Sequence, residues 1–77
     1  MKNISIETFA NRKAVIVYLN GESVLFSYDT KIASRDKNGK LNRHCDEYAL
    51  SMTTIRHLHA FAPETTKKKF LELPLKK

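Results

Sequence analysis

The sequence contains one cysteine, two glycines, two prolines and no tryptophan, and each shortage narrows what the protein can be. Because Cys45 is the only cysteine, a disulfide within the chain is excluded. The longest apolar run, residues 14–19, is far shorter than the roughly 20 residues that a membrane-spanning helix needs. Residues 1–6 lack the long apolar core of a secretory signal, so we expect a cytoplasmic protein with no membrane partner.

The length of 77 residues predicts a single domain over residues 1–77. We expect residues 1–50 to be mainly strands, residues 51–73 to be helical and residues 74–77 to be a tail. Domains of this size bury only about 60–65% of their unfolded surface, and many gain stability from a partner subunit.

The charge is unevenly distributed along the chain. Residues 1–30 carry three basic and three acidic side chains, whereas residues 31–77 carry eleven basic and five acidic ones, so the net charge of +6 comes from the second part. A basic segment of this kind favours phosphate backbones, acidic protein surfaces or anionic lipid heads. The alternative is that the lysines form only a soluble, solvated surface.

Both glycines follow asparagine, and Asn-Gly between apolar runs is the strongest short-range signal for a β-hairpin. A two-residue turn at Asn20-Gly21 pairs Leu19 with Glu22. The side chains expected on one face are Val15, Val17, Val24, Phe26 and Tyr28. Those expected on the other face are Ile16, Tyr18 and Leu25. Because both faces are apolar, we expect this hairpin to be central, with a helix or another subunit covering its second side.

A second hairpin is predicted at Asn38-Gly39, between the polar segments 32–35 and 41–44, where it projects as an arm or edge. A bend at Asp29-Thr30 would let one long strand serve both hairpins. Residues 3–9 alternate apolar and polar side chains and predict an edge strand. The sequence therefore predicts an antiparallel sheet of three or four strands.

We expect a helix to begin near Ser51, because Ser and Thr are favoured as N-cap residues. The residues that recur on one helical face are Ile55, Leu58, Phe61 and Ala62. Pro63 ends this helix and begins a second, short one whose apolar side contains Phe70, and Pro74 stops it. The predicted fold class is α+β, with one or two C-terminal helices on one face of the sheet. A homodimer would gain stability by covering the other face.

Two motifs in the chain occur together in a known group of proteins. Residues 26–33 follow the pattern apolar-Ser-Tyr-x-Thr-x-Ile-Ala, and Tyr48 and Ser51 lead into a Thr-Thr-x-x-His pattern at residues 53–57. In this combination residues 24–61 resemble a family of small uncharacterised proteins from bacteriophages and mobile elements. The resemblance implies a phage or plasmid origin, and hence a bacterial host cell, and it brings no catalytic residues.

Histidine and cysteine offer two weak candidates for chemistry. A zinc site would draw on His44, Cys45, His57 and His59. However, the first two are adjacent on a strand, and the last two diverge by about 200° on a helix. A Cys45 nucleophile with His57 or His59 as its base, oriented by Asp46, lacks a glycine-rich oxyanion loop. We therefore expect no metal, no cofactor and no enzymatic activity.

The start of the predicted helix is a candidate anion site. The hydroxyls of Ser51, Thr53 and Thr54 lie beside the free N–H groups and partial positive charge of a helix N-terminus. Arg56 and His57 would add further donors. The alternative is a plain N-cap, which needs only one of these groups.

The predicted contact surface for an anionic partner is basic. Its residues are Arg35, Lys37, Lys40, Arg43, Arg56, His57, Lys67, Lys68 and Lys69. A basic two-stranded arm can lie against a nucleic-acid backbone, and Tyr28 and Tyr48 would stack on bases if they are exposed. We predict a protein that binds DNA or RNA, largely without sequence specificity. The alternative is an inhibitor that caps an acidic surface of a host defence system or host enzyme, as anti-CRISPR proteins do.

Overall fold

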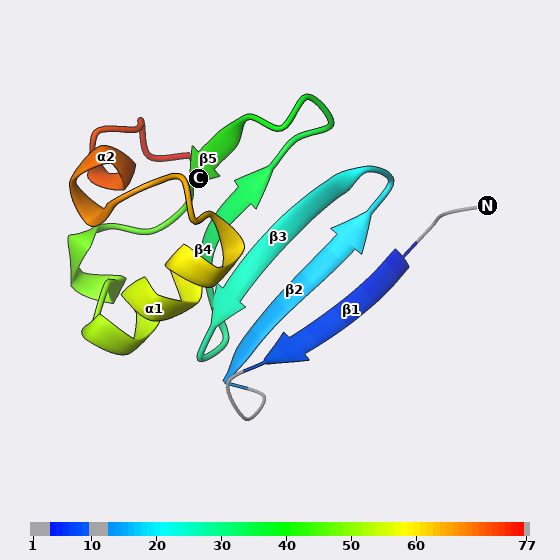
Figure 1. Ribbon diagram of the computed structural model, residues 1–77, viewed down its shortest axis with the longest axis horizontal. Helices are drawn as coiled ribbons and strands as arrows, with labels where there is room; N and C mark the ends of the chain where they lie inside the picture. Colours follow the sequence, from blue (N-terminus) through cyan, green and yellow to red (C-terminus); the bar gives the residue numbers. More distant parts are fainter. Residues whose placement is uncertain (1–3, 10–12, 77) are drawn as a thin grey trace.

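The computed structural model describes residues 4–9 and 13–76. Five strands form one antiparallel sheet whose spatial order β1-β2-β3-β4-β5 is also their order along the chain (Figure 1). The strands are β1 (Ile4–Phe9), β2 (Ala14–Leu19), β3 (Glu22–Ser27), β4 (Thr30–Arg35) and β5 (Leu41–Arg43). They are followed by the 3-10 turn η1 (Glu47–Ala49) and the helices α1 (Met52–Phe61) and α2 (Lys67–Leu71). The fold is α+β, as predicted, with more strands than the three or four expected.

The β2–β3 hairpin confirms the predicted register. Leu19 pairs with Glu22, and the apolar pairs follow from there along both strands. Asn20 and Gly21 have φ values of 51° and 87°, as a type I′ turn requires. β1 confirms the predicted edge strand; Asn3 at its expected start lies outside the described residues.

The β3–β4 connection corrects the prediction of one long strand. Tyr28 and Asp29 form a two-residue turn with φ values of 50° and 67°, so the chain reverses where only a bend was expected. Tyr28 therefore leaves the apolar stripe on which it was placed and is exposed. No glycine marks this turn, which is why the sequence did not reveal it. Beyond it, the register shifts between Leu25 and Phe26.

The β4–β5 hairpin forms at Asn38-Gly39, as predicted. Asp36 organises the loop, because its Oδ1 accepts hydrogen bonds of 2.9 Å from the backbone N–H groups of Asn38 and Lys40. Gly39 has a φ of 83°. The arm is thus held by a side chain as well as by its turn residues.

The two helices begin with capping side chains. Ser51 caps α1, which ends at Phe61, shortly before Pro63, as predicted. The second helix begins at Lys67 and not at Pro63, because the hydroxyl of Thr66 accepts from the backbone N–H of Lys69 and forms the cap. Pro63 lies in the connection between the helices. No helix within residues 4–9 and 13–76 has the length and apolar character needed to span a membrane.

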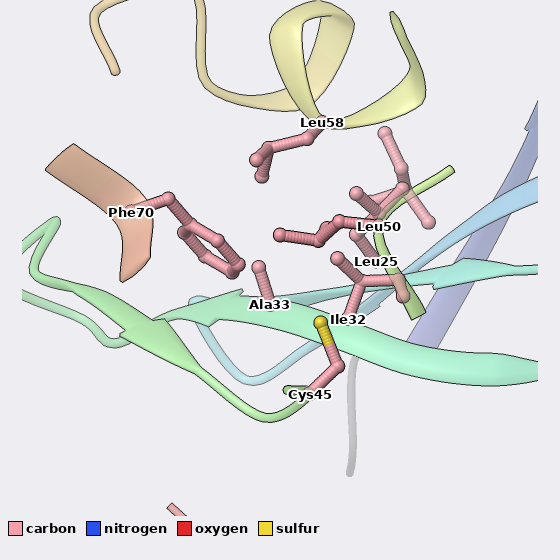
Figure 2. Close-up of a cluster of buried hydrophobic side chains, with 8 residues drawn as sticks. Leu25, Ile32, Ala33, Cys45, Leu50, Leu58 and Phe70 are labelled. Carbon is pink, nitrogen blue, oxygen red and sulfur yellow. The ribbon is translucent and has the colours of Figure 1, made fainter. Parts of the chain in front are cut away.

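The hydrophobic core lies between the helices and the β3–β5 part of the sheet (Figures 1 and 2). Its fully buried side chains include Leu25, Ile32, Leu58 and Phe70. The C-terminal tail runs beside β5, where Leu75 forms a parallel bridge with Arg43. β1 lies at the far edge of the sheet, away from the helical layer (Figure 1). The helices therefore cover only part of one sheet face.

Candidate functional site

An open groove of about 600 Å³ lies at the hairpin end of the sheet. It is lined by the start of β1, the β2–β3 turn and the first part of the β4–β5 arm. Strand register places four of its lining residues in one row across the sheet, and these are Ser5, Tyr18, Ser23 and Arg35. The row lies on the same face as Ile16 and Leu25, so it continues the helix-covered face beyond the helices.

Tyr18 is the aromatic residue of this groove. Its side chain is 37% exposed, and the hydroxyls of Ser5 and Ser23 lie on the strands at either side of it. Lys37 lines the groove from the second hairpin, and its side chain approaches the β2–β3 turn at Gly21. The groove also contains the carboxylates of Glu22 and Asp36, so its lining is mixed in charge.

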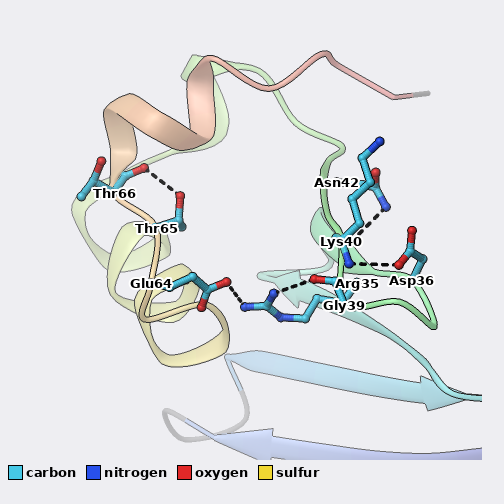
Figure 3. Close-up of polar contacts among 8 residues, drawn as sticks. All are labelled: Arg35, Asp36, Gly39, Lys40, Asn42, Glu64, Thr65 and Thr66. Carbon is cyan, nitrogen blue, oxygen red and sulfur yellow. Dashed lines mark hydrogen bonds and ion pairs between the residues drawn. The ribbon is translucent and has the colours of Figure 1, made fainter.

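Arg35 was predicted to contact an anionic partner, and its guanidinium is already engaged within the chain. It forms an ion pair with Glu64 and donates a 3.1 Å hydrogen bond to the carbonyl of Gly39 (Figure 3). Its guanidinium carbon also lies 5.7 Å from the centre of the Phe61 ring. The hydrogen bond from Arg35 lowers the pKa of Glu64, which keeps this carboxylate ionised. Arg35 thus connects the arm to the end of α1.

Arg43 has a similar structural role at the other end of β5. Its Nε donates to the carbonyl of Leu73 at 2.9 Å, and one terminal nitrogen donates to the carbonyl of Cys45 at 3.0 Å. These bonds tie the strand to the segment after α2. The bond to Leu73 makes this connection, and the two bonds together use two of the five guanidinium N–H groups of Arg43.

The other predicted cations are exposed. They are Lys37, Lys40, Arg56, Lys67, Lys68 and Lys69. None of them forms an ion pair with another residue in the described part of the chain. The structure does not gather them at one point, because the tip of the arm and α2 lie at opposite ends of β5 (Figure 1). They form a cationic group at the arm and another along the helices.

The candidate anion site at the start of α1 is a cap joined to a buried hydrogen-bond chain. The backbone N–H of Thr54 donates to Ser51 Oγ, and that hydroxyl donates to Thr54 Oγ1 at 3.1 Å. Thr54 Oγ1 lies 3.1 Å from Ser27 Oγ, which lies 2.8 Å from His57 Nδ1. Each of these hydroxyls can donate one hydrogen bond and accept others, so they form a continuous chain to His57 Nδ1, whose direction is set by the ring nitrogen that carries the proton. Thr53 is exposed beside it.

His57 is enclosed and uncharged in this arrangement. Its side chain is 3% exposed and lies against Phe9, with ring centres 5.5 Å apart, and against Tyr28 at 5.9 Å. Burial, with a smaller contribution from the charge of Lys13, lowers the pKa of His57 below its usual 6.5. His57 is therefore a structural residue and not a surface contact.

Cys45 and the other histidines do not form a chemical site in the described residues. Burial raises the pKa of the Cys45 thiol, so it remains protonated at neutral pH and packs in the core. His44 binds Ser34 Oγ through Nε2 at 2.7 Å and the carbonyl of Lys76 through Nδ1 at 3.2 Å. Within residues 4–9 and 13–76, no three side chains of His, Cys, Asp or Glu come together as metal ligands.

The groove residues Ser5, Tyr18 and Ser23 were not selected from the sequence. The register of the first hairpin correctly placed Tyr18 on the face of Ile16 and Leu25, but a helix or another subunit was expected to cover the second side of the hairpin, so no open groove was predicted there. The short helical layer leaves the end of this face open. Tyr48, one of the two tyrosines proposed for stacking, is 97% exposed on η1 and does not line this groove.

The chain was compared with known families, curated proteins and solved structures. Residues 2–73 match a family of unknown function, DUF8033. The chain belongs to this family. No curated protein and no solved structure matches it.

The DUF8033 match spans all five strands and both helices. It therefore includes the groove, the Arg35 contacts and the hydrogen-bond chain that ends on His57. The family description assigns no activity to any of these features, so a function has to be argued from their chemistry.

Proposed function

We propose that this DUF8033 chain is a non-enzymatic protein that binds single-stranded nucleic acid, with one base held in the groove against Tyr18. The observation that carries the proposal is an exposed aromatic ring in an open groove that has a lysine at its side. Single-strand binders combine aromatic platforms with cations that follow the backbone. An origin in a phage or mobile element belongs to the same proposal and rests on the resemblance of residues 24–61.

The groove chemistry suits a base. Tyr18 offers a ring face on which any base can stack, and the hydroxyls of Ser5 and Ser23 can both donate and accept hydrogen bonds at its edge. Hydroxyls of this kind do not distinguish strongly between bases. We therefore expect binding with little sequence preference.

The charges suit a phosphate backbone that approaches from the arm. Lys37 and Lys40 are exposed at the tip of the second hairpin, and Lys37 lines the groove. The cations of α1 and α2 are part of the net charge of +6, and this charge attracts polyanions before contact is made. Arg35 and Arg43 contribute by holding the arm in place, since their guanidinium groups bind within the chain.

The first test is a fluorescence-anisotropy titration with labelled single-stranded DNA, single-stranded RNA and duplex DNA. We expect tighter binding to single strands, and we expect Tyr18→Ala to weaken it about tenfold, because stacking contributes about 1–3 kcal/mol per base. Tyr48→Ala is the matched control, since it removes an exposed tyrosine outside the groove. Equal effects of the two substitutions would remove the groove from the proposal.

The second test uses the salt dependence of the same binding. Lys37→Gln should reduce the slope of log affinity against log salt by about 0.7, the value for one phosphate contact on a single strand. Lys76→Gln is the control, because Lys76 loses the same charge but lies beside Arg43 at the far end of β5. An unchanged slope for Lys37→Gln would show that Lys37 contacts no phosphate.

The exposed cations also fit an acidic protein surface, such as that of a host enzyme or defence protein. The two partners are separated by the titration and by an affinity pull-down from nuclease-treated bacterial lysate. Failure to bind any oligonucleotide at low salt, together with recovery of one host protein in stoichiometric amount, would replace nucleic acid with that protein.

A further inference from the structure

The sheet face turned away from the helices is apolar across three strands. We call it the rear face, and strand register gives its rows. The rows are Ile4–Leu19–Glu22, Ile6–Val17–Val24 and Thr8–Val15–Phe26–Lys31. An antiparallel sheet with one solvated face normally alternates apolar and polar residues, with the polar ones outward. Here the outward positions of β1 to β3 are mostly aliphatic or aromatic.

β1 shows most clearly that this face is made for burial. Ile4 and Ile6 point to the rear and are 60% and 66% exposed, whereas Ser5 and Glu7 between them point to the helix side. In residues 4–7 of β1 the apolar side is therefore turned away from the hydrophobic core of its own chain, and only Phe9 at the end of the strand packs against that core. Such a surface marks a contact with another molecule.

The charges on the rear face point to a second copy as the occupant. Glu22 and Lys31 are the two charged side chains that the described strands place on this face, and they lie toward opposite ends of it. Consider a two-fold axis that lies in the plane between two sheets and perpendicular to their strands. Rotation about it brings the rear faces of the two sheets together and makes the strands of one copy run opposite to those of the other. Glu22 of each copy then lies over the Lys31 end of the other, and the apolar rows meet between them.

We propose that the chain forms a two-fold symmetric dimer through the rear faces of two sheets, with Glu22 of each copy beside Lys31 of the other. The dimer is a sandwich of two sheets, and its outer layers are the helices.

Ile4, Leu19 and Glu22 line one margin of the groove and also belong to the rear face, so the dimer would cover that margin. Ser5, Tyr18 and Ser23 lie on the other face and stay uncovered, and Ile6 does not line the groove, so a substitution of Ile6 tests the dimer apart from the proposed function.

The dimer is tested by light scattering after size exclusion and by sedimentation equilibrium. At about 100 µM we expect a mass twice the 8.9 kDa of the chain. Ile6→Lys should give a monomer, because it places a charge in the central apolar row. Ser5→Lys makes the same change of charge one residue earlier on the opposite face, and it should remain a dimer. A monomeric wild-type chain at this concentration would overturn the proposal.

Charge exchange gives a sharper test that leaves the apolar rows intact. E22K and K31E should each weaken the dimer, by about tenfold in dissociation constant, because each places like charges together twice in the interface. The double variant E22K/K31E should restore wild-type association. Failure of this rescue would rule out the proposed axis. A wild-type chain that is monomeric and binds a different protein through the surface around Ile6 would contradict the proposed dimer.

Discussion

The two ends of the sheet are built in opposite ways. In β3 and β4 the buried residues face the helices, and Leu25, Ile32 and Ala33 are completely enclosed there. At the start of β1, Ile4 and Ile6 face the other way and remain exposed, while the helix side carries Ser5 and Glu7. Only at its end does this strand place an apolar side chain, Phe9, against the helix side. One continuous sheet thus contains a region whose packing is complete and a region whose packing requires another molecule.

This difference between the two regions predicts that residues of the enclosed region determine folding stability, whereas residues of the open region determine binding. Substitutions in the enclosed region should act on folding, because side chains there have no room to relax. Substitutions at the open end should act on association and ligand binding, because the same residue types there contact solvent in a single copy. Measurements that compare matched positions in the two regions test this division directly.

The largest effect is expected from truncation in the core. Leu25→Ala should lower the free energy of unfolding by about 3 kcal/mol, because it leaves a cavity beside Leu58 and Phe70. Ile6→Ala, at an exposed position of β1, should cost below about 1 kcal/mol when the protein is dilute enough to be monomeric. Urea denaturation of both variants measures the difference, and equal losses would contradict the division between the two regions.

An intermediate effect is expected in the hydrogen-bond chain under α1. Ser27→Ala removes a buried hydroxyl that is the hydrogen-bond partner of both His57 Nδ1 and Thr54 Oγ1. It should lower the free energy of unfolding by about 1–3 kcal/mol. Ser23→Ala removes a hydroxyl of the same kind four residues earlier on the same strand, at the open groove, and should change the free energy of unfolding by less than about 0.5 kcal/mol. Denaturation curves for the two variants decide the matter, and a neutral Ser27→Ala would mean that the chain contributes no stability.

The smallest effect is expected from pH. The pKa of His57 is lowered by burial, so the unfolded chain binds a proton more readily than the folded one. The free energy of unfolding is therefore highest at pH values above 6.5, the usual pKa of histidine, and it decreases as the pH falls below that value. The decrease is at most about 1 kcal/mol for one histidine between pH 6.5 and 5.5. The pKa of His44 is lowered by burial and by Lys31, and it adds a slope of the same sign.

His57→Gln should therefore flatten the dependence of unfolding free energy on pH. His59→Gln, on the exposed side of α1, is the control and should keep the wild-type slope. Urea denaturation at several pH values measures both. Identical slopes for wild type and His57→Gln would show that the buried histidine is not the titrating group.

Much of the fold was predictable from local chemistry. Two Asn-Gly turns identified two hairpins and the register of the first, and Ser51 identified the start of α1. The β3–β4 reversal was missed, because Tyr28 and Asp29 adopt positive φ without the glycine that normally signals such a turn. The start of α2 was misplaced, because Pro63 and Thr66 both carry start signals, and the helix begins after the Thr66 cap.

The candidate site was less predictable than the fold. Net charge indicated an anionic partner, but it could not show that Arg35 and Arg43 bind carbonyl groups and Glu64 of their own chain. The contacts of Arg35 with Glu64 and of Arg43 with Leu73 join residues 29 and 30 positions apart in sequence, and no local pattern encodes them. Tyr18 became a candidate only when the extent of the helical layer was known.

The attachment of the C-terminal segment to β5 has a consequence for polymerisation. Leu75 and the backbone N–H of Lys76 both bind at Arg43, so the chain closes that margin of its own sheet, while β1 forms the other margin. Fibril growth requires two free margins, one to receive a strand and one to offer the next. A molecule closed on one side ends any such growth after a single addition. The contacts of residues 75–76 with Arg43 would thus limit edge-to-edge pairing of folded molecules to the margin formed by β1.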